Sequence, residues 1–256
     1  MKPAAYDGIA ATEARQWWHR IRRLLAARLI ASAGLPPGAN ALDLGCGTGG
    51  TLRIFQPLGV SRLVGIDRSE RALYLARRHD AGALLLCGDA SQPLPLPSEV
   101  FELATIFGVL NHEWIGDEKE PLRELHRVLR PGGLLFVTEP AFPSLMRNMD
   151  RMGMTRRRYR PGEIAGLARA AGFELVRDGH FAAWAFVPAW LVARLERRGA
   201  SPAEADSVPV PVDWRMAPAW LEALCYALSR AEIAAIGLGL RFPVGLTYFG
   251  LFRKPY

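Results

Sequence analysis

The chain has 256 residues, half of them hydrophobic, which is enough to bury a sizeable core in one elaborated domain and unfavourable to two independent ones. Lysine and arginine outnumber aspartate and glutamate by 32 to 25, and the resulting net charge of +7 comes almost entirely from arginine. The three cysteines lie far apart, which argues against a disulfide framework or a zinc site and suits a reducing cytoplasm. We expect no signal peptide, because Asp7 and Glu13 precede any long apolar run, and no membrane-spanning segment, because no uninterrupted apolar run is long enough.

The N-terminal region has the spacing of an amphipathic helix. Apolar residues recur at intervals of three and four between residues 11 and 33, and Gly34 with the prolines after it predicts the end of the helix. The helix contains the pair Trp17 and Trp18, which either covers a binding site or packs the helix onto a sheet. Both interpretations remain open at this point.

A buried strand and a glycine turn follow. Residues 41–44 are predicted to form the strand, and Gly45, Gly47 and Gly49 let the backbone adopt positive φ and approach a ligand closely. The same stretch has glycines at 45, 47 and 50, which is the spacing of a dinucleotide-binding fingerprint. The turn therefore predicts a nucleotide-like ligand without specifying which one.

Three acidic residues occur at the ends of three predicted strands. Asp43 lies two residues before the first glycine, and its carboxylate is expected to face the ligand site, where it favours an amino group over a pyrophosphate. Asp67 ends a second strand at residues 63–66, where it can accept hydrogen bonds from ribose hydroxyls. Asp89 follows a third strand at residues 83–87 and suits an adenine amino group. Together they suit an adenosine with a cationic amino-acid tail.

The remaining elements alternate between helices and strands. Ser69 is a plausible N-cap for a helix that ends at His79, and an Arg-Pro-Gly-Gly sequence stops a later helix. The predicted elements are, in order, a helix ending near Pro57, a helix at 69–79, strands at 101–107 and 134–138, a helix at 117–129 between them, a loop or lid at 139–160, a helix at 161–172, a strand beginning at 173–176, an apolar helix at 181–193, a linker at 199–213, a helix at 214–236 and a strand at 246–252.

These motifs, in this order and at these intervals, resemble the class I S-adenosylmethionine-dependent methyltransferases, and the resemblance covers the whole chain. It implies an α/β fold, a doubly wound and mostly parallel seven-stranded sheet whose last strand inserts antiparallel between the fifth and the sixth. It also implies S-adenosylmethionine as the cofactor, bound by Asp43, Gly45, Cys46, Gly47, Gly49, Asp67, Arg68, Asp89, Ala90 and Phe107.

Four regions are expected along the chain. They are an N-terminal helical cap at 1–37, a cofactor-binding core at 38–180, an inserted helical lid or acceptor subdomain at 181–240, and the final strand of the core sheet at 241–256.

Methyl transfer from a sulfonium requires the protein to align the cofactor with the acceptor and requires no metal. A hydroxyl acceptor needs a base, whereas a carboxylate or a neutral amine does not. His112 after the fourth strand and Glu139 after the fifth are the candidate bases, with His19 and His180 behind them. Residues expected to contact the acceptor are Trp17, Trp18, Arg157, Tyr159 and Trp184. Arginines 156–158 form either an anion site or a solvated basic turn. In one bacterial branch of the family histidines stand near positions 149 and 155, where this chain has Met149 and Thr155.

The predicted function is methylation of a small-molecule or peptide acceptor, on oxygen, in a biosynthetic pathway. A reductase linked to NAD(P) is one alternative, although no tyrosine is followed four positions later by lysine. An RNA methyltransferase is another, prompted by the basic charge and opposed by the lack of an appended RNA-binding domain, so we expect no nucleic-acid partner. The third alternative is a non-catalytic module that binds S-adenosylmethionine. The sequence predicts no oligomeric state.

Overall fold

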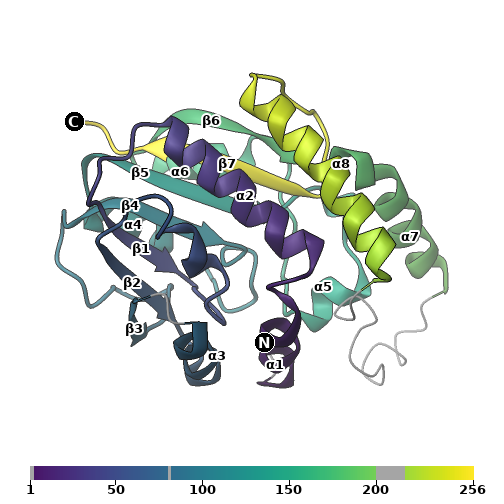
Figure 1. Ribbon diagram of the computed structural model, residues 1–256, viewed down its shortest axis with the longest axis horizontal. Coiled ribbons are helices and arrows are strands. Elements are labelled where there is room, and N and C mark those ends of the chain that lie inside the picture. Colours follow the sequence, from purple (N-terminus) through teal and green to yellow (C-terminus); the bar gives the residue numbers. More distant parts are fainter. Residues whose placement is uncertain (1–2, 80–81, 200–216) are drawn as a thin grey trace.

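The computed structural model describes residues 3–79, 82–199 and 217–256. Its centre is a seven-stranded sheet with the strand order β3-β2-β1-β4-β5-β7-β6 (Figure 1). The strands are β1 Asn40–Leu44, β2 Arg62–Asp67, β3 Leu84–Cys87, β4 Phe101–Phe107, β5 Leu129–Pro140, β6 Glu174–Phe181 and β7 Thr247–Arg253. The first five are mutually parallel, and β7 pairs antiparallel with both β5 and β6. The predicted fold class is confirmed.

Helices cover both faces of the sheet, which explains why its central strands are almost continuously apolar. The helices are α1 Pro3–Thr12, α2 Trp17–Ser32, α3 Glu70–Ala76, α4 Lys119–Val128, α5 Asn148–Met152, α6 Glu163–Ala170, α7 Phe186–Gly199 and α8 Ala219–Gly237. On one face, α2 and α8 share a core cluster with the sheet, and on the other α4 and α6 do the same. In Figure 1, α2 and α8 cross the near face side by side.

The predicted N-terminal helix differs from the observed structure, because it is broken into α1 and α2 between Thr12 and Trp17. The carboxylate of Glu222, from α8, accepts a hydrogen bond from the backbone N–H of Trp17 at 2.7 Å. The first N–H groups of a helix have no partner inside it, so this distant carboxylate stabilises a new helix start at Trp17. The break thus depends on a tertiary contact that local spacing does not contain.

Two other elements differ from the predictions. The helix expected between the glycine turn and Pro57 is only a 3-10 turn, η1 Thr51–Ile54. Strand β5 begins at Leu129 instead of residue 134, because Leu129 already pairs with Phe101 across a bulge. The Ser69 cap is confirmed, since its side chain accepts a hydrogen bond from the N–H of Ala72 at 3.2 Å.

The loop or lid expected at 139–160 contains two short helices, η3 Pro143–Leu145 and α5. In the inserted subdomain expected at 181–240, the short helix η4 Ala183–Ala185 precedes α7. The predicted linker at 199–213 and the start of the predicted helix at Trp214 lie outside the described residues, except for the helical end at Gly199. In the described part of the chain, no helix combines the length and the apolar character that crossing a bilayer would require. The boundaries at residues 37, 180 and 240 stay predictions.

Candidate functional site

Two adjoining cavities open where the parallel strands end. The first has a volume of about 310 Å³ and the second about 430 Å³, within the usual range of small-ligand pockets. Both lie at the carboxyl edge of the sheet, the usual place for ligands in open α/β sheets. The residues that border both cavities are Ile9, His19, Arg22, Gly108, Asn111, Met149 and Asp150.

The glycine turn after β1 forms one wall of the first cavity. Gly45 has φ +78°, and a Cβ there would stand 2.2 Å from Cγ2 of Val109. Gly49 has φ +88°, and a Cβ there would approach the Cα of Ala76 in α3 to 3.0 Å. A side chain at either position would be strained and would collide with its neighbour. The turn can therefore be this tight only with glycine.

Asp67 at the end of β2 ties the glycine turn to the start of α3. Its Oδ2 accepts a hydrogen bond from the N–H of Gly47, and its Oδ1 from the N–H of Ser69, both at 2.9 Å. The carboxylate borders the first cavity, and burial raises its pKa. A carboxylate has about four acceptor positions. Asp67 thus retains acceptor capacity for ligand hydroxyls, and its binding of a ribose stays a prediction.

Asp43 does not border either cavity, unlike the sequence expectation. It is fully buried and accepts hydrogen bonds from the hydroxyls of Thr51 at 2.5 Å and Thr105 at 2.6 Å. Burial raises the pKa of Asp43 to about 6, although these two hydrogen bonds lower it. The side chain therefore joins β1, β4 and the turn after the glycines, and supports the ligand site from behind.

The far end of the first cavity is bordered by Gly88 and Ala90, which flank Asp89. Asp89 does not border the cavity itself; its Oδ1 accepts from both the N–H and the hydroxyl of Ser91, and its Oδ2 lies 3.9 Å from Nε of Arg68. Among the other predicted cofactor residues, those that border the first cavity are Gly45, Cys46, Gly47, Arg68 and Phe107, whereas Gly49 does not.

His112 borders the first cavity only. Its ring stacks on the ring of Trp114, with 4.1 Å between the two centroids. The guanidinium carbon of Arg68 lies over the Trp114 ring, 4.8 Å from its centroid. Nδ1 lies 3.2 Å from the carbonyl oxygen of Met154, so the ring donates a proton there and keeps Nε2 as an acceptor. Burial lowers the pKa of His112 to about 4. The ring is neutral at pH 7 and a weak base.

Glu139 borders the second cavity and is fully buried. Its carboxylate accepts hydrogen bonds from three successive backbone N–H groups, those of Val109 at 3.0 Å, Leu110 at 2.9 Å and Asn111 at 3.2 Å. Burial raises the pKa of Glu139 to about 8, while these donors and the charge of Arg22 oppose the rise. The group fixes the turn after β4 beside both cavities.

Arg22 of α2 is the site residue that sequence reasoning missed. It borders both cavities, and its Nη2 donates to the hydroxyl of Thr138 at 3.2 Å. Its buried Nε has no hydrogen-bond partner within the described part of the chain. Burial lowers the pKa of Arg22 to about 10, and Glu139 and Asp43 counteract this. In the sequence, Arg22 is one arginine among several on a helix, and nothing distinguishes it from those on the surface.

The predicted acceptor residues divide into two groups. Trp17 and Trp18 border the second cavity, and Trp184 supports Trp17 at 5.5 Å between ring centroids. Arg157 and Tyr159 border neither cavity, which corrects the sequence expectation. Among the lower-ranked bases, His19 borders both cavities, with its pKa lowered to about 3 by burial, and His180 borders neither.

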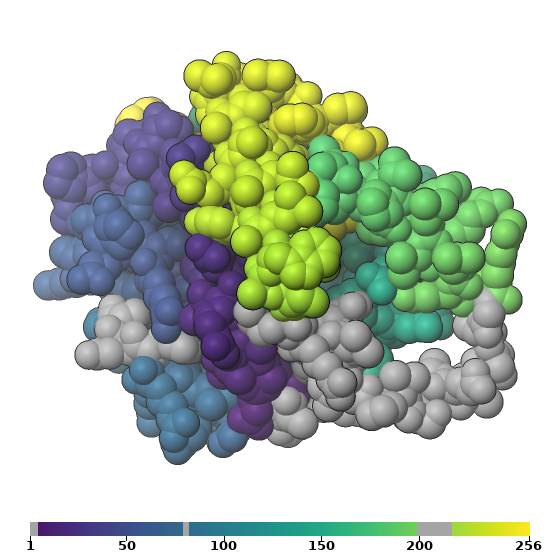
Figure 2. Space-filling model, turned by 45° about the vertical axis from the view of Figure 1, so that its right-hand side comes forward, coloured from purple at the N-terminus to yellow at the C-terminus, as the bar shows by residue number. Residues whose placement is uncertain are grey.

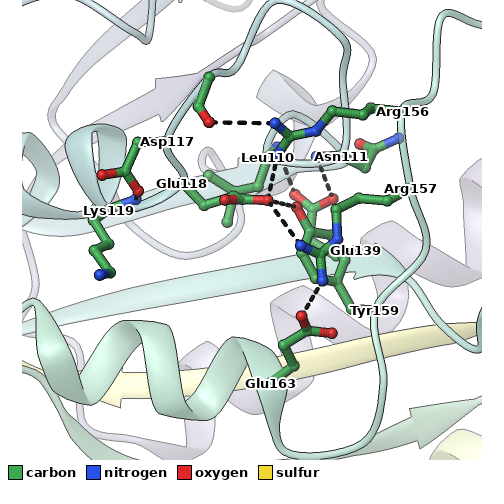
Figure 3. A network of polar contacts seen from close by, with 11 residues as sticks. Leu110, Asn111, Asp117, Glu118, Lys119, Glu139, Arg156, Arg157, Tyr159 and Glu163 are labelled. Atoms are coloured by element: carbon green, nitrogen blue, oxygen red, sulfur yellow. Dashed lines mark hydrogen bonds and ion pairs between the residues drawn. The ribbon is translucent and has the colours of Figure 1, made fainter.

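The arginine run forms ion pairs with carboxylates of the fold (Figure 3). Arg156 lies 2.5 Å from an oxygen of Glu118, and Arg157 pairs with both Glu118 and Glu163. The hydroxyl of the buried Tyr159 also donates to Glu118, at 3.3 Å. Arg158, which does border the second cavity, is held by Asp150. Neither an anion site nor a freely solvated turn describes Arg156 and Arg157.

The strand order, the glycine turn after β1, the acid that ends β2 and the polar loop after β3 together define a class I methyltransferase fold. Residues 42–137 match the family model described as a methyltransferase domain. Residues 42–137 therefore form a methyltransferase domain of the kind that uses S-adenosylmethionine as its cofactor.

Similar proteins agree with this assignment. The chain is 33% identical over 141 residues to a malonyl-[acyl-carrier protein] O-methyltransferase of Serratia marcescens, covering 55% of this chain and 50% of that protein. It is 35% identical over 124 residues to a demethylmenaquinone methyltransferase of Staphylococcus aureus, covering 46% and 50%. The chain thus spans about half the length of these curated relatives. A crystal structure of an S-adenosylmethionine-dependent methyltransferase from Mesorhizobium loti has the same fold, with a TM-score of 0.57, 20% identity and coverage of 90% and 96%.

Proposed function

We propose that this protein transfers a methyl group from S-adenosylmethionine, bound in the first cavity, to a small molecule bound in the second. The observation that carries the proposal is that the two cavities adjoin and share Arg22, Gly108 and Asn111 at their junction. Methyl transfer needs the sulfonium and the acceptor atom in line on opposite sides of the methyl group. Two cavities that meet at one point supply that alignment, which in favourable cases lowers a barrier by roughly 7 to 11 kcal/mol.

The first cavity suits the cofactor in one orientation. The adenine lies by Gly88 and Ala90, the ribose hydroxyls donate to Asp67, and the methionine part follows the glycine turn. In that orientation the methionine carboxylate reaches Arg22, whose Nη2 lies only 3.7 Å from where a Cβ of Gly108 would be. A guanidinium group binds carboxylates through paired hydrogen bonds. Arg22 thus anchors the amino-acid end of the cofactor at the junction.

We propose an oxygen atom as the acceptor, with Glu139 as the base for a hydroxyl. Of the two predicted bases only Glu139 borders the second cavity, and because burial raises its pKa to about 8, its carboxylate becomes available as a base as the pH rises towards that value. The weakly basic His112 instead shapes the cofactor pocket beside Trp114. The name of the Serratia relative, an O-methyltransferase, supports the choice of oxygen over the part of the chain that it matches.

The cofactor site is tested by Asp67→Ala. Hydrogen bonds to charged groups contribute about 1.5 to 3 kcal/mol, so affinity for S-adenosylmethionine should fall about tenfold to a hundredfold. The matched control is Asp117→Ala, because Asp117 also accepts from the N–H two residues later but borders neither cavity. Calorimetry that finds the same affinity in both folded variants would contradict the proposed site.

Catalysis is tested separately, with methyl-labelled S-adenosylmethionine and a panel of hydroxylated, carboxylated and amine acceptors. Labelled product and S-adenosylhomocysteine should form with an oxygen acceptor, and Asp67→Ala should need about tenfold to a hundredfold more cofactor for the same rate. Transfer to amines alone would refute O-methylation. Tight cofactor binding without turnover on any acceptor would favour the non-catalytic module.

A further inference from the structure

Helix α8 exposes a row of large apolar side chains to solvent. Trp220, Leu224 and Leu228 recur at intervals of four and are exposed, Trp220 to 68%. Its buried face packs on the core through Ile233 and Ile236 and also carries Glu222 and Glu232, which are only 7% and 8% exposed. A surface helix normally turns its apolar face inward. The exposed face of α8 therefore needs a partner that the rest of the chain does not supply within the described residues.

The orientation of α8 is fixed by specific contacts of its inner polar face. Glu222 accepts from the N–H groups of Trp17 at 2.7 Å and Ala217 at 3.2 Å. Glu232 accepts from the N–H of Ala183 at 2.9 Å. Rotating the helix to bury its leucines would leave these N–H groups and carboxylates without partners, which is costly.

Helix α7 adds a second exposed apolar row. Val187, Leu191 and Leu195 also recur at intervals of four, and Val187 and Leu195 are 61% and 66% exposed. Figure 1 draws α7 and α8 on the same side of the molecule, and in Figure 2 both reach the visible surface, with α8 near the middle and α7 to its right. We call these two rows the α7/α8 face.

The charges on this face are of one sign. Every exposed charged side chain of α7 and α8 in the described residues is an arginine, namely Arg194, Arg197, Arg198 and Arg230. Exposed tryptophan and leucine together with arginine is the composition of helices that lie in the surface of an anionic bilayer. The overall charge of +7 adds to the attraction.

We propose that the α7/α8 face binds the surface of an anionic lipid bilayer. A second copy of this chain is the less favourable occupant, because a symmetric contact would bring the four arginines of each copy together without carboxylates to neutralise them. The proposed binding is to the surface of the bilayer, since no helix in the described residues could span it. This surface binding is independent of the proposed methyl transfer and can be measured without an acceptor.

Co-sedimentation with vesicles tests the proposal. The wild-type protein should bind vesicles of equal parts phosphatidylglycerol and phosphatidylcholine, and salt should weaken the binding. The double variant Leu224→Ser/Leu228→Ser should bind about tenfold or more weakly. The matched control is Leu84→Ser, which changes a leucine that is 59% exposed on β3, at the opposite edge of the sheet, and should leave binding unchanged. Replacing the four arginines by glutamine should cost about fivefold per arginine and remove the preference over pure phosphatidylcholine.

Three results would overturn the proposal. They are failure of the wild-type protein to bind the anionic vesicles, equal binding by the double leucine variant, and a dimer in sedimentation experiments that only the double leucine variant abolishes. The last result would assign the face to a second copy. Calorimetry with S-adenosylmethionine on each variant shows whether the domain is folded, and thereby separates a lost surface from a lost structure.

Discussion

At the scale of single residues, the site is a small cluster of buried charges around Arg22. Glu139 and Asp43 both interact electrostatically with the guanidinium group of Arg22. Burial is the main cause of the pKa shift of all three groups: it lowers the pKa of Arg22 and raises those of Asp43 and Glu139. Each carboxylate also holds a piece of backbone or a hydroxyl in place. The charges that face the cavities thus depend on residues whose first role is to fix the ends of β1, β4 and β5.

The raised pKa of Glu139 predicts a pH dependence of stability. In the unfolded chain the group loses its proton near 4.5, whereas in the folded protein it does so near 8, so between these values the folded state binds more protons. The free energy of unfolding therefore falls as the pH rises through this window, by about 1.4 kcal/mol per pH unit for one group. The lowered pKa values of His112 and His19 act in the opposite direction but only below about 6.5.

Urea unfolding at closely spaced pH values between about 6.5 and 8 should therefore show a decline in the wild-type protein and almost none in Glu139→Gln. Glu196→Gln, which alters a carboxylate paired with Arg147 away from β4, should keep the wild-type slope. If Glu139→Gln declined as steeply as the wild type, another group would be responsible.

The proposed contact between Arg22 and the methionine carboxylate predicts a ligand-specific defect. Arg22→Gln should bind S-adenosylhomocysteine about tenfold or more weakly, because a hydrogen-bonded charge is lost. It should bind 5′-methylthioadenosine, which lacks the amino-acid carboxylate, almost as well as the wild type does. Arg20→Gln is the control, since the Arg20 guanidinium packs on the ring of Tyr226 in α8. Equal losses for both ligands in calorimetry would mean that Arg22 only maintains the fold.

At the scale of elements, the sequence predicted the features that depend on local patterns. It did not predict the features that depend on contacts between residues far apart in the chain. The strand at 101–107 agrees with β4 at both ends, and Ser69 caps α3 as expected. The break before Trp17 could not be predicted, because it depends on Glu222, some two hundred residues later in the chain. The prediction that Arg157 contacts the acceptor is wrong for a related reason, because Arg157 pairs with Glu118, which comes from another loop. Pairings of this kind leave no periodicity in the sequence.

The glycine turn gives a prediction at this scale. Gly49→Ala should lower the free energy of unfolding by about 1 to 3 kcal/mol, because alanine would be strained at this positive φ and its Cβ would press on the backbone of α3. Gly47→Ala is the contrast, since its φ is +54° and no atom lies within 4 Å of the added Cβ. It should lose less stability. Urea unfolding of both variants decides the order, and a greater loss in Gly47→Ala would contradict this account of the turn.

At the scale of the whole molecule, helix α8, which follows β6 in the chain, is part of the main core. Ile233 and Ile236 of α8 belong to the same buried cluster as Ile21 and Leu25 of α2. The helical subdomain expected from the sequence therefore shares its hydrophobic contacts with the sheet and the N-terminal helices. We propose that this region covers the acceptor cavity, to which α7 contributes Ala189, while remaining one cooperative unit with the rest.

Cooperativity of this kind predicts the effect of Ile233→Ala. Removing a buried isoleucine side chain typically costs about 2 to 5 kcal/mol. Unfolding should occur in a single transition, destabilised by the same amount whether it is followed by the helical circular dichroism signal or by the loss of S-adenosylmethionine binding. Ala234→Ser, which changes the exposed neighbouring position, should have little effect. Two separate transitions in Ile233→Ala would instead establish an independent helical subdomain.

Helix α1 has a consequence for the speed of turnover. Tyr6 and Ile9 border the first cavity. Between α1 and α3 the described residues form one small cluster, in which Tyr6, Ala72 and Leu75 are buried and Ala10 packs against them, with an exposed ion pair between Asp7 and Arg71 beside it. So few contacts can open without unfolding the sheet. We propose that opening of α1 controls how long S-adenosylmethionine and its demethylated product stay bound. If so, exchange of the cofactor and not the chemical step limits turnover once the acceptor is saturating, as product release does in many enzymes.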